Sequence, residues 1–269
     1  MIEELQAGMF SSPWRHRELL VAMIRRQVSG RYRGSIAGTL WSVLHPIFLL
    51  SIYTLVFSAL FKARWQGSDS NASFALIVFA GFLVFNLFAE CVNAAPGLVV
   101  GNANYVKKVL FPLEILPWVS LGAALFHTVA GLAVWLLFHL CVAGWPPLTA
   151  LALPVLLLPL VLFTQGLCWA LSSLGVFLRD IGQLTGVLTT ALMFVSAIFY
   201  PPSALPGSWQ HWLFLNPMAL FIDQARAVLI QGQLPSLQSW CIELLACTAV
   251  AWLGFLWFQK TRKAFADVL

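Results

Sequence analysis

Hydrophobic residues dominate the chain, and the longest stretch without Asp, Glu, Lys or Arg runs for 64 residues, from Ile115 to Leu178. A helix crosses the hydrocarbon core of a bilayer, about 30 Å thick, with about 20 mostly apolar residues. The stretch is therefore long enough for two crossings. A turn between them is indicated by the sequence Gly144-Trp145-Pro146-Pro147. This pattern predicts an integral membrane protein.

The complete apolar pattern predicts an all-α integral membrane protein with six transmembrane helices. Charged residues separate the apolar stretches, as Arg33 and Lys62 do on either side of the first. We place the six spans at residues 36–61, 74–100, 115–141, 149–176, 181–200 and 237–259. The chain then has three parts, which are an N-terminal segment, a transmembrane domain and a tail at residues 1–35, 36–259 and 260–269.

The positive residues predict how the spans are oriented, because cytoplasmic loops carry an excess of Lys and Arg. With the N-terminus inside, twelve positive residues are cytoplasmic, namely Arg15, Arg17, Arg25, Arg26, Arg31, Arg33, Lys107, Lys108, Arg179, Lys260, Arg262 and Lys263. Only Lys62, Arg64 and Arg226 are then outside. An even number of spans places both termini in the cytoplasm.

An amphipathic helix is predicted at residues 14–28, before the first span. With about 100° per residue, its apolar face comprises Leu19, Leu20, Met23, Ile24 and Val28, and its charged face comprises Arg15, Glu18, Arg25 and Arg26. Such a helix lies along a membrane interface. Two interpretations stay open at this point, which are an anchor near anionic lipid and a docking surface for a cytoplasmic partner.

The outer stretch 201–236 is too long for a tight turn and too apolar for an ordinary loop; it contains Trp209 and Trp212. Asn216-Pro217 divides it, because the residue before a proline is driven out of helical geometry. We predict two short re-entrant helices here. Irregular backbone at membrane depth must be buried in protein or line a cavity. A periplasmic gate is therefore one interpretation, and a simple interfacial cap is the other.

Composition narrows the class of protein. The chain is 60% hydrophobic and 9% charged, whereas soluble domains carry about 25% charged residues. The net charge of +5 does not indicate nucleic-acid binding, because the positive residues flank apolar spans instead of forming a separate polar domain. The five cysteines are scattered through apolar stretches without a C-x-x-C pair, so we expect small buried side chains rather than disulfides or metal ligands.

The motifs of several kinds of chemistry are missing from the sequence. It has no G-x-x-x-x-G-K-[ST] loop, no H-E-x-x-H and no G-x-S-x-G, and so it predicts no nucleotide or metal site and no hydrolase. Glu90 and Glu243 are the acids within the spans, and they are candidates for a proton relay or for pairing with polar neighbours. We interpret His127 as packed or hydrogen-bonded. A channel, a secondary transporter and a permease driven by a separate ATPase remain open.

Aromatic residues suggest a conduit for sugars, since the C–H faces of sugar rings stack on aromatic rings. The spacing along the first span and at the end of the fifth gives six candidates, Trp41, Phe48, Tyr53, Phe57, Phe194 and Tyr200. The alternative is that these side chains face lipid or pack. Glycines at four-residue spacing, at 30, 34 and 38 and at 182 and 186, either bring spans one and five together or, for Gly30 and Gly34, end the amphipathic helix.

Longer motifs extend over residues 30–240. They are Arg31-Tyr32-Arg33-Gly34-Ser35, Leu40-Trp41-Ser42, His45-Pro46, the run from Tyr53 to Ser58, the run from Phe61 to Trp65, Pro96-Gly97-Leu98, the run from Asn104 to Pro117, Leu178-Arg179-Asp180-Ile181-Gly182-Gln183, Ile198-Phe199-Tyr200-Pro201 and Leu215-Asn216-Pro217. In this combination the chain resembles the membrane subunit of polysaccharide-exporting ABC transporters, and the O-antigen (lipopolysaccharide) export branch in particular.

The resemblance implies a homodimer of this chain with two copies of a cytoplasmic ATP-binding subunit, in the bacterial inner membrane. No cofactor is expected in this chain, because ATP and Mg would be bound by the partner subunit. The implied cargo is a polysaccharide on a polyprenyl diphosphate carrier, moved from the cytoplasmic to the periplasmic side. The chain itself is then a transport subunit and not an enzyme.

The resemblance also implies roles for individual residues. The interface helix 14–28 and the segment 101–114 would couple to the ATPase through Glu18, Arg25, Arg26, Asn104, Tyr105, Lys107 and Lys108. Spans one and five of both protomers would line the conduit, and the stretch 201–236 would form the gate with Trp209, Trp212, Asn216 and Pro217. Arg31 and Arg33 suit the carrier diphosphate, because a guanidinium pairs with phosphate in a bidentate fork; ordinary inside-positive topology is the alternative.

One position departs from the family pattern. Related chains often have Ser-Pro-Ile where this chain has Ser196-Ala197-Ile198, so we expect a missing or weaker proline kink in span five.

Three alternative functions stay open, which are export of another surface glycan (capsule or teichoic acid), export of a small lipid or drug, and an enzyme acting on polyprenyl-linked sugars. The enzyme would need convergent acids at one face, and Glu90, Glu114 and Asp180 form no known motif.

Overall fold

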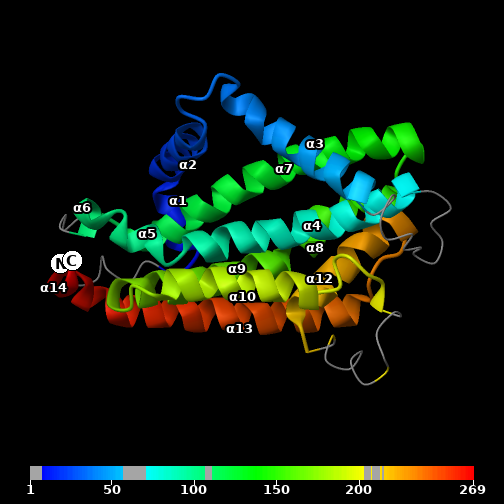
Figure 1. Cartoon of the computed structure of the whole chain (residues 1–269). Helices are drawn as coiled ribbons and strands as arrows, with labels where there is room; N and C mark the ends of the chain where they lie inside the picture. Colours follow the sequence, from blue (N-terminus) through cyan, green and yellow to red (C-terminus); the bar gives the residue numbers. More distant parts are fainter. Residues whose placement is uncertain (1–7, 57–70, 107–110, 203–206, 208–212, 214) are drawn as a thin grey trace.

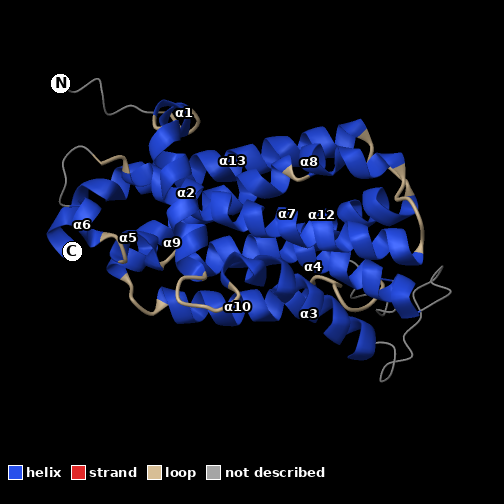
Figure 2. Ribbon diagram, turned by 90° about the horizontal axis from the view of Figure 1, so that it is seen from above, coloured by secondary structure: helices blue, strands red, loops and turns tan. Residues whose placement is uncertain are grey.

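The computed structural model describes residues 8–56, 71–106, 111–202, 207, 213 and 215–269. Every regular element in these ranges is a helix, which confirms the predicted all-α class. The long helices lie side by side along one direction (Figures 1 and 2). We call the end of the bundle that carries α6 (Ala103–Val106) the α6 end, and the opposite end, with α12 (Pro217–Arg226), the α12 end.

Among the described residues, four helices are long and apolar enough to cross a membrane, and they fall where spans two, three, four and six are predicted. They contain α4 (Asn71–Ala94), α7 (Leu116–Val142), α9 (Leu158–Phe177) and α13 (Leu237–Thr261). At span five the helix is shorter, since α10 (Ile181–Val195) has 15 residues and, at about 1.5 Å per residue, is about 22 Å long. At span one the structure describes α3 (Trp41–Val56), and residues 57–70 lie outside the described ranges. The six-span topology therefore stays a prediction.

The structure corrects several span boundaries. The end predicted for span two at residue 100 is wrong, because α4 ends at Ala94, just before Pro96, and the short helices α5 (Gly97–Val100) and α6 follow. Span five ends early, at Val195, and α3 begins at Trp41 instead of residue 36. Span four begins with η5 (Leu148–Ala152) and α8 (Leu153–Leu156) before α9, which has a proline in its first turn.

Two helices replace the single amphipathic helix predicted at 14–28. The chain breaks at His16, between α1 (Ser11–Arg15) and α2 (Arg17–Arg31). α2 crosses α7 closely, since a Cβ added at Gly122 would lie 2.3 Å from Cδ1 of Ile24. Of the predicted apolar face, Val28 is buried but Leu19 is exposed. The location of α2 at a membrane interface stays a prediction.

Glycines on the long helices serve close packing at positions other than those predicted. α9 and α13 meet at Gly166 and Gly254, where a Cβ on Gly254 would lie 2.1 Å from the carbonyl oxygen of Gly166. By contrast, a Cβ added at Gly186 would meet nothing within 4 Å in this chain. Gly34 and Gly38 have positive φ angles of 85° and 51°. They turn the chain from α2 into η2 (Gly38–Leu40) and α3, in line with the turn interpretation.

The remaining elements lie at the two ends. At the α12 end, α12 continues into the π-helical η7 (Ala227–Gln231); of the two short helices predicted in 201–236, only this second one lies within the described residues. η4 (Leu113–Ile115) precedes α7, and η8 (Arg262–Ala264) and α14 (Phe265–Val268) follow α13.

All five cysteines are free. Cys141 and Cys241 are exposed in this chain, so the expectation of burial is wrong for these two.

Candidate functional site

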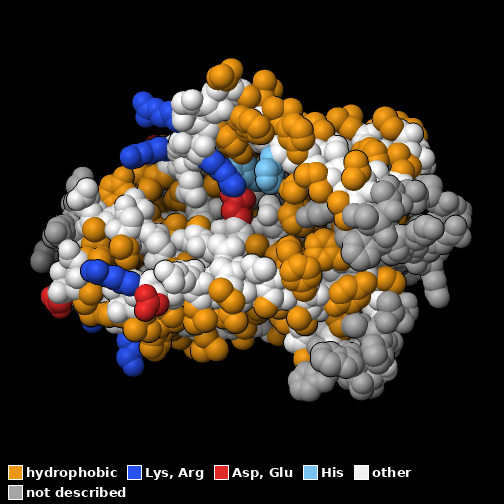
Figure 3. Space-filling view, viewed as in Figure 1, with side chains coloured by type: hydrophobic (Ala, Val, Ile, Leu, Met, Phe, Trp, Pro, Cys, Tyr) orange, Lys and Arg blue, Asp and Glu red, His pale blue; other side chains and the backbone are white. Residues whose placement is uncertain are grey.

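A cavity of about 500 Å³, lined by both polar and apolar side chains, opens between α2, α3, α4 and α7. Figure 3 shows basic, acidic and histidine side chains close together in a hollow of the surface. The cavity wall combines groups that bind anions or hydroxyls with aromatic rings, and includes Arg31, Tyr32, Trp41, Asn86, Glu90 and His127. Cavities with a few convergent polar groups are the usual places for ligands.

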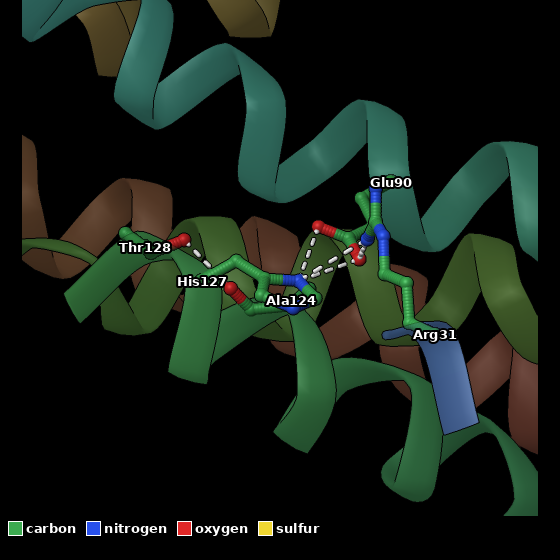
Figure 4. A network of polar contacts seen from close by, with 5 residues as sticks. All are labelled: Arg31, Glu90, Ala124, His127 and Thr128. Atoms are coloured by element: carbon green, nitrogen blue, oxygen red, sulfur yellow. Dashed lines mark hydrogen bonds and ion pairs between the residues drawn. The ribbon is translucent and has the colours of Figure 1, made fainter. Parts of the chain in front are cut away.

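The centre of the cavity is a three-residue network formed by Arg31 of α2, Glu90 of α4 and His127 of α7. Nη1 of Arg31 donates to Oε1 of Glu90 and lies 3.3 Å from Nδ1 of His127. The same Nδ1 lies 2.8 and 3.1 Å from the two carboxylate oxygens of Glu90. Figure 4 shows Arg31 and His127 reaching the carboxylate from different helices. The carboxylate is thus shared by two partners.

Exposure differs sharply within the network. The side chain of Arg31 is 54% exposed, whereas those of Glu90 and His127 are 19% and 10% exposed. In the described part of the chain, Nε2 of His127 is buried without a hydrogen-bond partner. A buried polar atom without a partner costs free energy, and here it belongs to a side chain that lines the cavity.

Aromatic rings border the network. Tyr32 meets the His127 ring edge to face, with centroids 6.0 Å apart. Burial raises the pKa of the Tyr32 hydroxyl, against a lowering by the neighbouring Arg31, so this group is a neutral donor at physiological pH. Trp41 is held over the cavity by a hydrogen bond of 2.7 Å from its Nε1 to Oγ of Ser35. The left-handed turn at Gly34 makes this return of the chain over α2 feasible.

The predicted carrier-binding pair is divided by the structure. Arg31 is part of the cavity, but Arg33 is exposed and does not line it. The predicted conduit residues are divided too. Trp41 lines the cavity, and its ring lies 6.4 Å from that of Phe48, which is exposed on α3.

The other conduit candidates lie elsewhere. Phe194 is exposed near the end of α10, and its carbonyl oxygen accepts a hydrogen bond of 2.8 Å from the hydroxyl of Tyr200. Phe57 lies outside the described residues, as does the side chain of Tyr53. The structure of one chain therefore groups the aromatic candidates into two separate places.

The two elements expected to couple to an ATPase contact one another at the α6 end. Nη1 of Arg26, on α2, donates to the hydroxyl of Tyr105, on α6, over 3.4 Å. Glu18 and Arg25 line a shallow depression on the exposed side of α2, and Asn104 is exposed on α6. Lys107 and Lys108 lie outside the described residues.

A buried carboxylate joins three distant parts of the chain near the α6 end. Glu114 accepts hydrogen bonds of 3.0 Å from Oγ of Ser12 and 2.8 Å from Nη1 of Arg262. Nε1 of Trp169 donates to the backbone oxygen of Glu114 over 3.1 Å. We call these four residues the Glu114 clasp. They join α1, η4, α9 and η8, which contain Ser12, Glu114, Trp169 and Arg262 respectively.

A buried arginine organises the α12 end. Arg226, predicted to be an external positive residue, is only 2% exposed. Its guanidinium donates to the backbone oxygens of Ile77, Ala197 and Ile198 over 3.1, 2.9 and 2.7 Å. These bonds join α12 to α4 and to the segment after α10. A Cβ added at Gly81 would lie 2.6 Å from Nη2 of Arg226, so the close approach needs a glycine.

The segment after α10 departs from helical geometry. Ala197 has a φ of +52°, which proline cannot adopt because its ring fixes φ near −65°. The expected loss of a proline kink is thus accompanied by a left-handed residue at this position. Next to it, Asn216 caps α12 by accepting from the backbone N–H of Met218, and it donates to Ser196 over 2.9 Å. Pro217 is the first residue of α12, and Trp209 and Trp212 lie outside the described residues.

Sequence reasoning named several of these residues without finding their partners. It left Glu90 between a proton relay and pairing with polar neighbours, and it interpreted His127 as packed or hydrogen-bonded; the structure joins the two in one network with Arg31. Glu243 likewise accepts two hydrogen bonds from Gln224. The available signal was that intramembrane acids need a partner. The sequence could not show which of the distant polar residues supplies it.

Comparison with known proteins identifies the family. The sequence model of the ABC-2 type transporter family matches residues 18–230. The chain belongs to the ABC-2 type transporter family. This match spans both ends of the bundle, from α2 with its cavity to η7. ABC-2 permeases are transport subunits, and a separate subunit hydrolyses ATP in these systems.

Curated relatives of this ABC-2 permease align over most of their length. The O-antigen export system permease protein RfbA of Myxococcus xanthus is 25% identical over 94% of this chain and 96% of its own. The protein of the same name from Klebsiella pneumoniae is 23% identical over 94% and 95%. The polysialic acid transport protein KpsM of Escherichia coli is 22% identical over 78% and 81%.

Proposed function

We propose that this ABC-2 permease is the transmembrane subunit of an ATP-driven exporter of a polyprenyl-diphosphate-linked polysaccharide of the O-antigen kind. The observation that carries the proposal is the alignment with an O-antigen export permease over 94% of this chain and 96% of the relative. The polymer would move from the cytoplasmic to the periplasmic side of a bacterial inner membrane. ATP and Mg would be bound by the partner subunit.

The assembly that we propose is a homodimer with two ATP-binding subunits, in which each permease chain has six spans. The α6 end would face the cytoplasm, since α1, α2 and the tail together carry eight of the fifteen Lys and Arg residues. There, α2 and the segment 101–114 would contact the ATPase. The hydrogen bond between Arg26 and Tyr105 supports this part of the proposal, because a movement of either element is passed to the other.

The conduit that we propose runs between the α3 and α10 helices of the two protomers. Phe48 on α3 and Phe194 on α10 are more than half exposed in the single chain, which leaves their rings available to a second copy and to a sugar chain. At the α12 end, the segment 201–236 would gate the conduit, with α12 held in place by Asn216 and Arg226. Lys107 and Lys108 would belong to the coupling surface.

The proposed function is tested by deleting the gene and following the polysaccharide. We expect carrier-linked polymer to accumulate inside the cell and to disappear from the surface, with rescue by this chain together with its ATPase. The control is a Lys107→Glu, Lys108→Glu double variant, which should stay in the membrane but fail to rescue. Unchanged surface polymer without a trapped intermediate would refute the proposal and favour export of a small lipid or drug.

Capsule export is a second candidate for the same machinery. It is favoured by the KpsM relative and by the capsule polysaccharide export inner-membrane protein CtrC of Neisseria meningitidis, which is 22% identical over 78% of both chains. The deletion experiment separates the two candidates by the class of polymer that is trapped. Loss of a capsule with normal O-antigen would support capsule export.

A further inference from the structure

In the cavity between α2, α3, α4 and α7, the carboxylate of Glu90 occupies the side of Arg31 that an anionic ligand would contact. Within the described residues, the Arg31 guanidinium makes its contacts with Glu90 and His127 through Nη1. In the described residues, Nη2 and Nε of Arg31 have no hydrogen-bond partner. A guanidinium can bind phosphate oxygens with two parallel N–H groups. Arg31 therefore retains the donors for a second anion on its open side.

Glu90 can release Arg31 without losing its only partner. Its carboxylate oxygens lie 2.8 and 3.1 Å from Nδ1 of His127, which is nine-tenths buried behind it. An ion pair whose arginine is half exposed adds little stability, because solvent screens it. An incoming anion can thus take Arg31 while the carboxylate stays hydrogen-bonded to the histidine.

We infer that this cavity binds the diphosphate headgroup of a lipid carrier, and that Glu90 is a resident counter-ion which the headgroup displaces from Arg31. The inference rests on the proposed function and specifies its entry site. The aromatic rings of Trp41 and Tyr32 at the rim suit the first sugar. Because Nδ1 of His127 donates to the Glu90 carboxylate, the buried Nε2, which has no partner among the described residues, would accept a hydrogen bond from a hydroxyl of the first sugar.

The inference makes Glu90 and Arg31 act in opposite directions. Removal of the Glu90 charge takes away the competitor for Arg31, so ligand affinity rises. Removal of Arg31 takes away the binding group, so affinity falls. If the pair were merely structural, both changes would loosen α2 from α4 and would lower affinity together. The sign of the Glu90 effect therefore decides between the two roles.

The test is equilibrium binding of farnesyl diphosphate to the full-length permease, purified with its ATPase subunit in lipid nanodiscs. We expect Glu90→Gln to bind about tenfold more tightly and Arg31→Ala about tenfold more weakly than the wild type, as for a charge-assisted hydrogen bond. Arg33→Ala, exposed and outside the cavity, is the matched control and should leave affinity unchanged. Thermal unfolding of each variant verifies that it is folded.

Three outcomes would overturn the inference. They are a Glu90→Gln variant that binds no more tightly than the wild type, equal effects of Arg33→Ala and Arg31→Ala, and no binding to the wild type. Inorganic diphosphate and farnesol are the further arms. We expect both to bind at least tenfold more weakly, and equal affinity for inorganic diphosphate would exclude a lipid headgroup as the ligand. Export is measured separately, so that export without these binding effects refutes the site alone and absence of export refutes the proposed function.

Discussion

Arg31 and Arg226 lie toward opposite ends of the bundle and have opposite surroundings. Arg31 is half exposed, and its guanidinium contacts two side chains, those of Glu90 and His127. Arg226 is buried and donates to three backbone oxygens, which are fixed by the course of the chain. The difference teaches that an arginine bound to the backbone organises structure, whereas one bound to side chains beside a cavity is available for exchange with a ligand.

The largest expected effect is on stability at Arg226. In Arg226→Met, three buried carbonyl oxygens lose their donor, and unpaired buried groups are costly. We expect the free energy of unfolding to fall by about 3–5 kcal/mol, as for breaking a buried charged network. Thermal unfolding of the purified protein in nanodiscs is the measurement, with the exposed Arg33→Met as control. A loss below about 1 kcal/mol would place Arg226 in the same class as Arg31.

A smaller effect is expected at Gly81, which makes room for Arg226. The Cβ of Gly81→Ala would lie 2.6 Å from Nη2 of Arg226 and 3.0 Å from Cγ2 of Ile222. Because three carbonyl oxygens hold the guanidinium, it cannot swing away freely, and we expect a loss of about 1–3 kcal/mol, typical of overpacking. Gly186→Ala, which would meet nothing within 4 Å, is the matched control in the same unfolding assay. Equal stability of the two variants would mean that Arg226 has freedom to shift.

The smallest effect on stability is expected at Arg31. The guanidinium is 54% exposed, so Arg31→Ala should cost at most about 1 kcal/mol of unfolding free energy. Export of the polymer should nevertheless fall severely, because the proposed headgroup contact is lost. The measurement is surface polymer per unit of membrane-inserted protein. A stability loss as large as that of Arg226→Met, with export in proportion, would erase the contrast between the two arginines.

The sequence was sufficient to predict the helical class and the places of the apolar helices, because the length of an apolar segment can be read directly from consecutive residues. It was less successful at helix ends. Pro96 stops α4 six residues before the predicted end of span two, and α10 ends at Val195 although the apolar run continues. Hydropathy records how long a segment stays apolar, whereas a proline or a left-handed residue decides where its helix ends.

The candidate site was only partly predictable. Arg31 was named for its charge and Trp41 for its ring, and both line the cavity. Their meeting with Glu90 and His127 depends on how α2 crosses α7, which is set by the fit of Ile24 against Gly122. Arg226 was assigned to the outside because it lies between predicted spans five and six, and its burial depends on carbonyl oxygens from residues 28, 29 and 149 positions away. Contacts over such separations are not encoded in any local pattern.

The Glu114 clasp has a consequence for the order in which the protein is made. When Glu114 is added to the nascent chain, its partner Ser12 has already been synthesised. Its charged partner Arg262 is synthesised 148 residues later. During translation the acid therefore has no arginine to neutralise it. The clasp at the α6 end can therefore form completely only after Arg262 has been synthesised, and a chain truncated before Arg262 leaves the buried Glu114 carboxylate without its arginine.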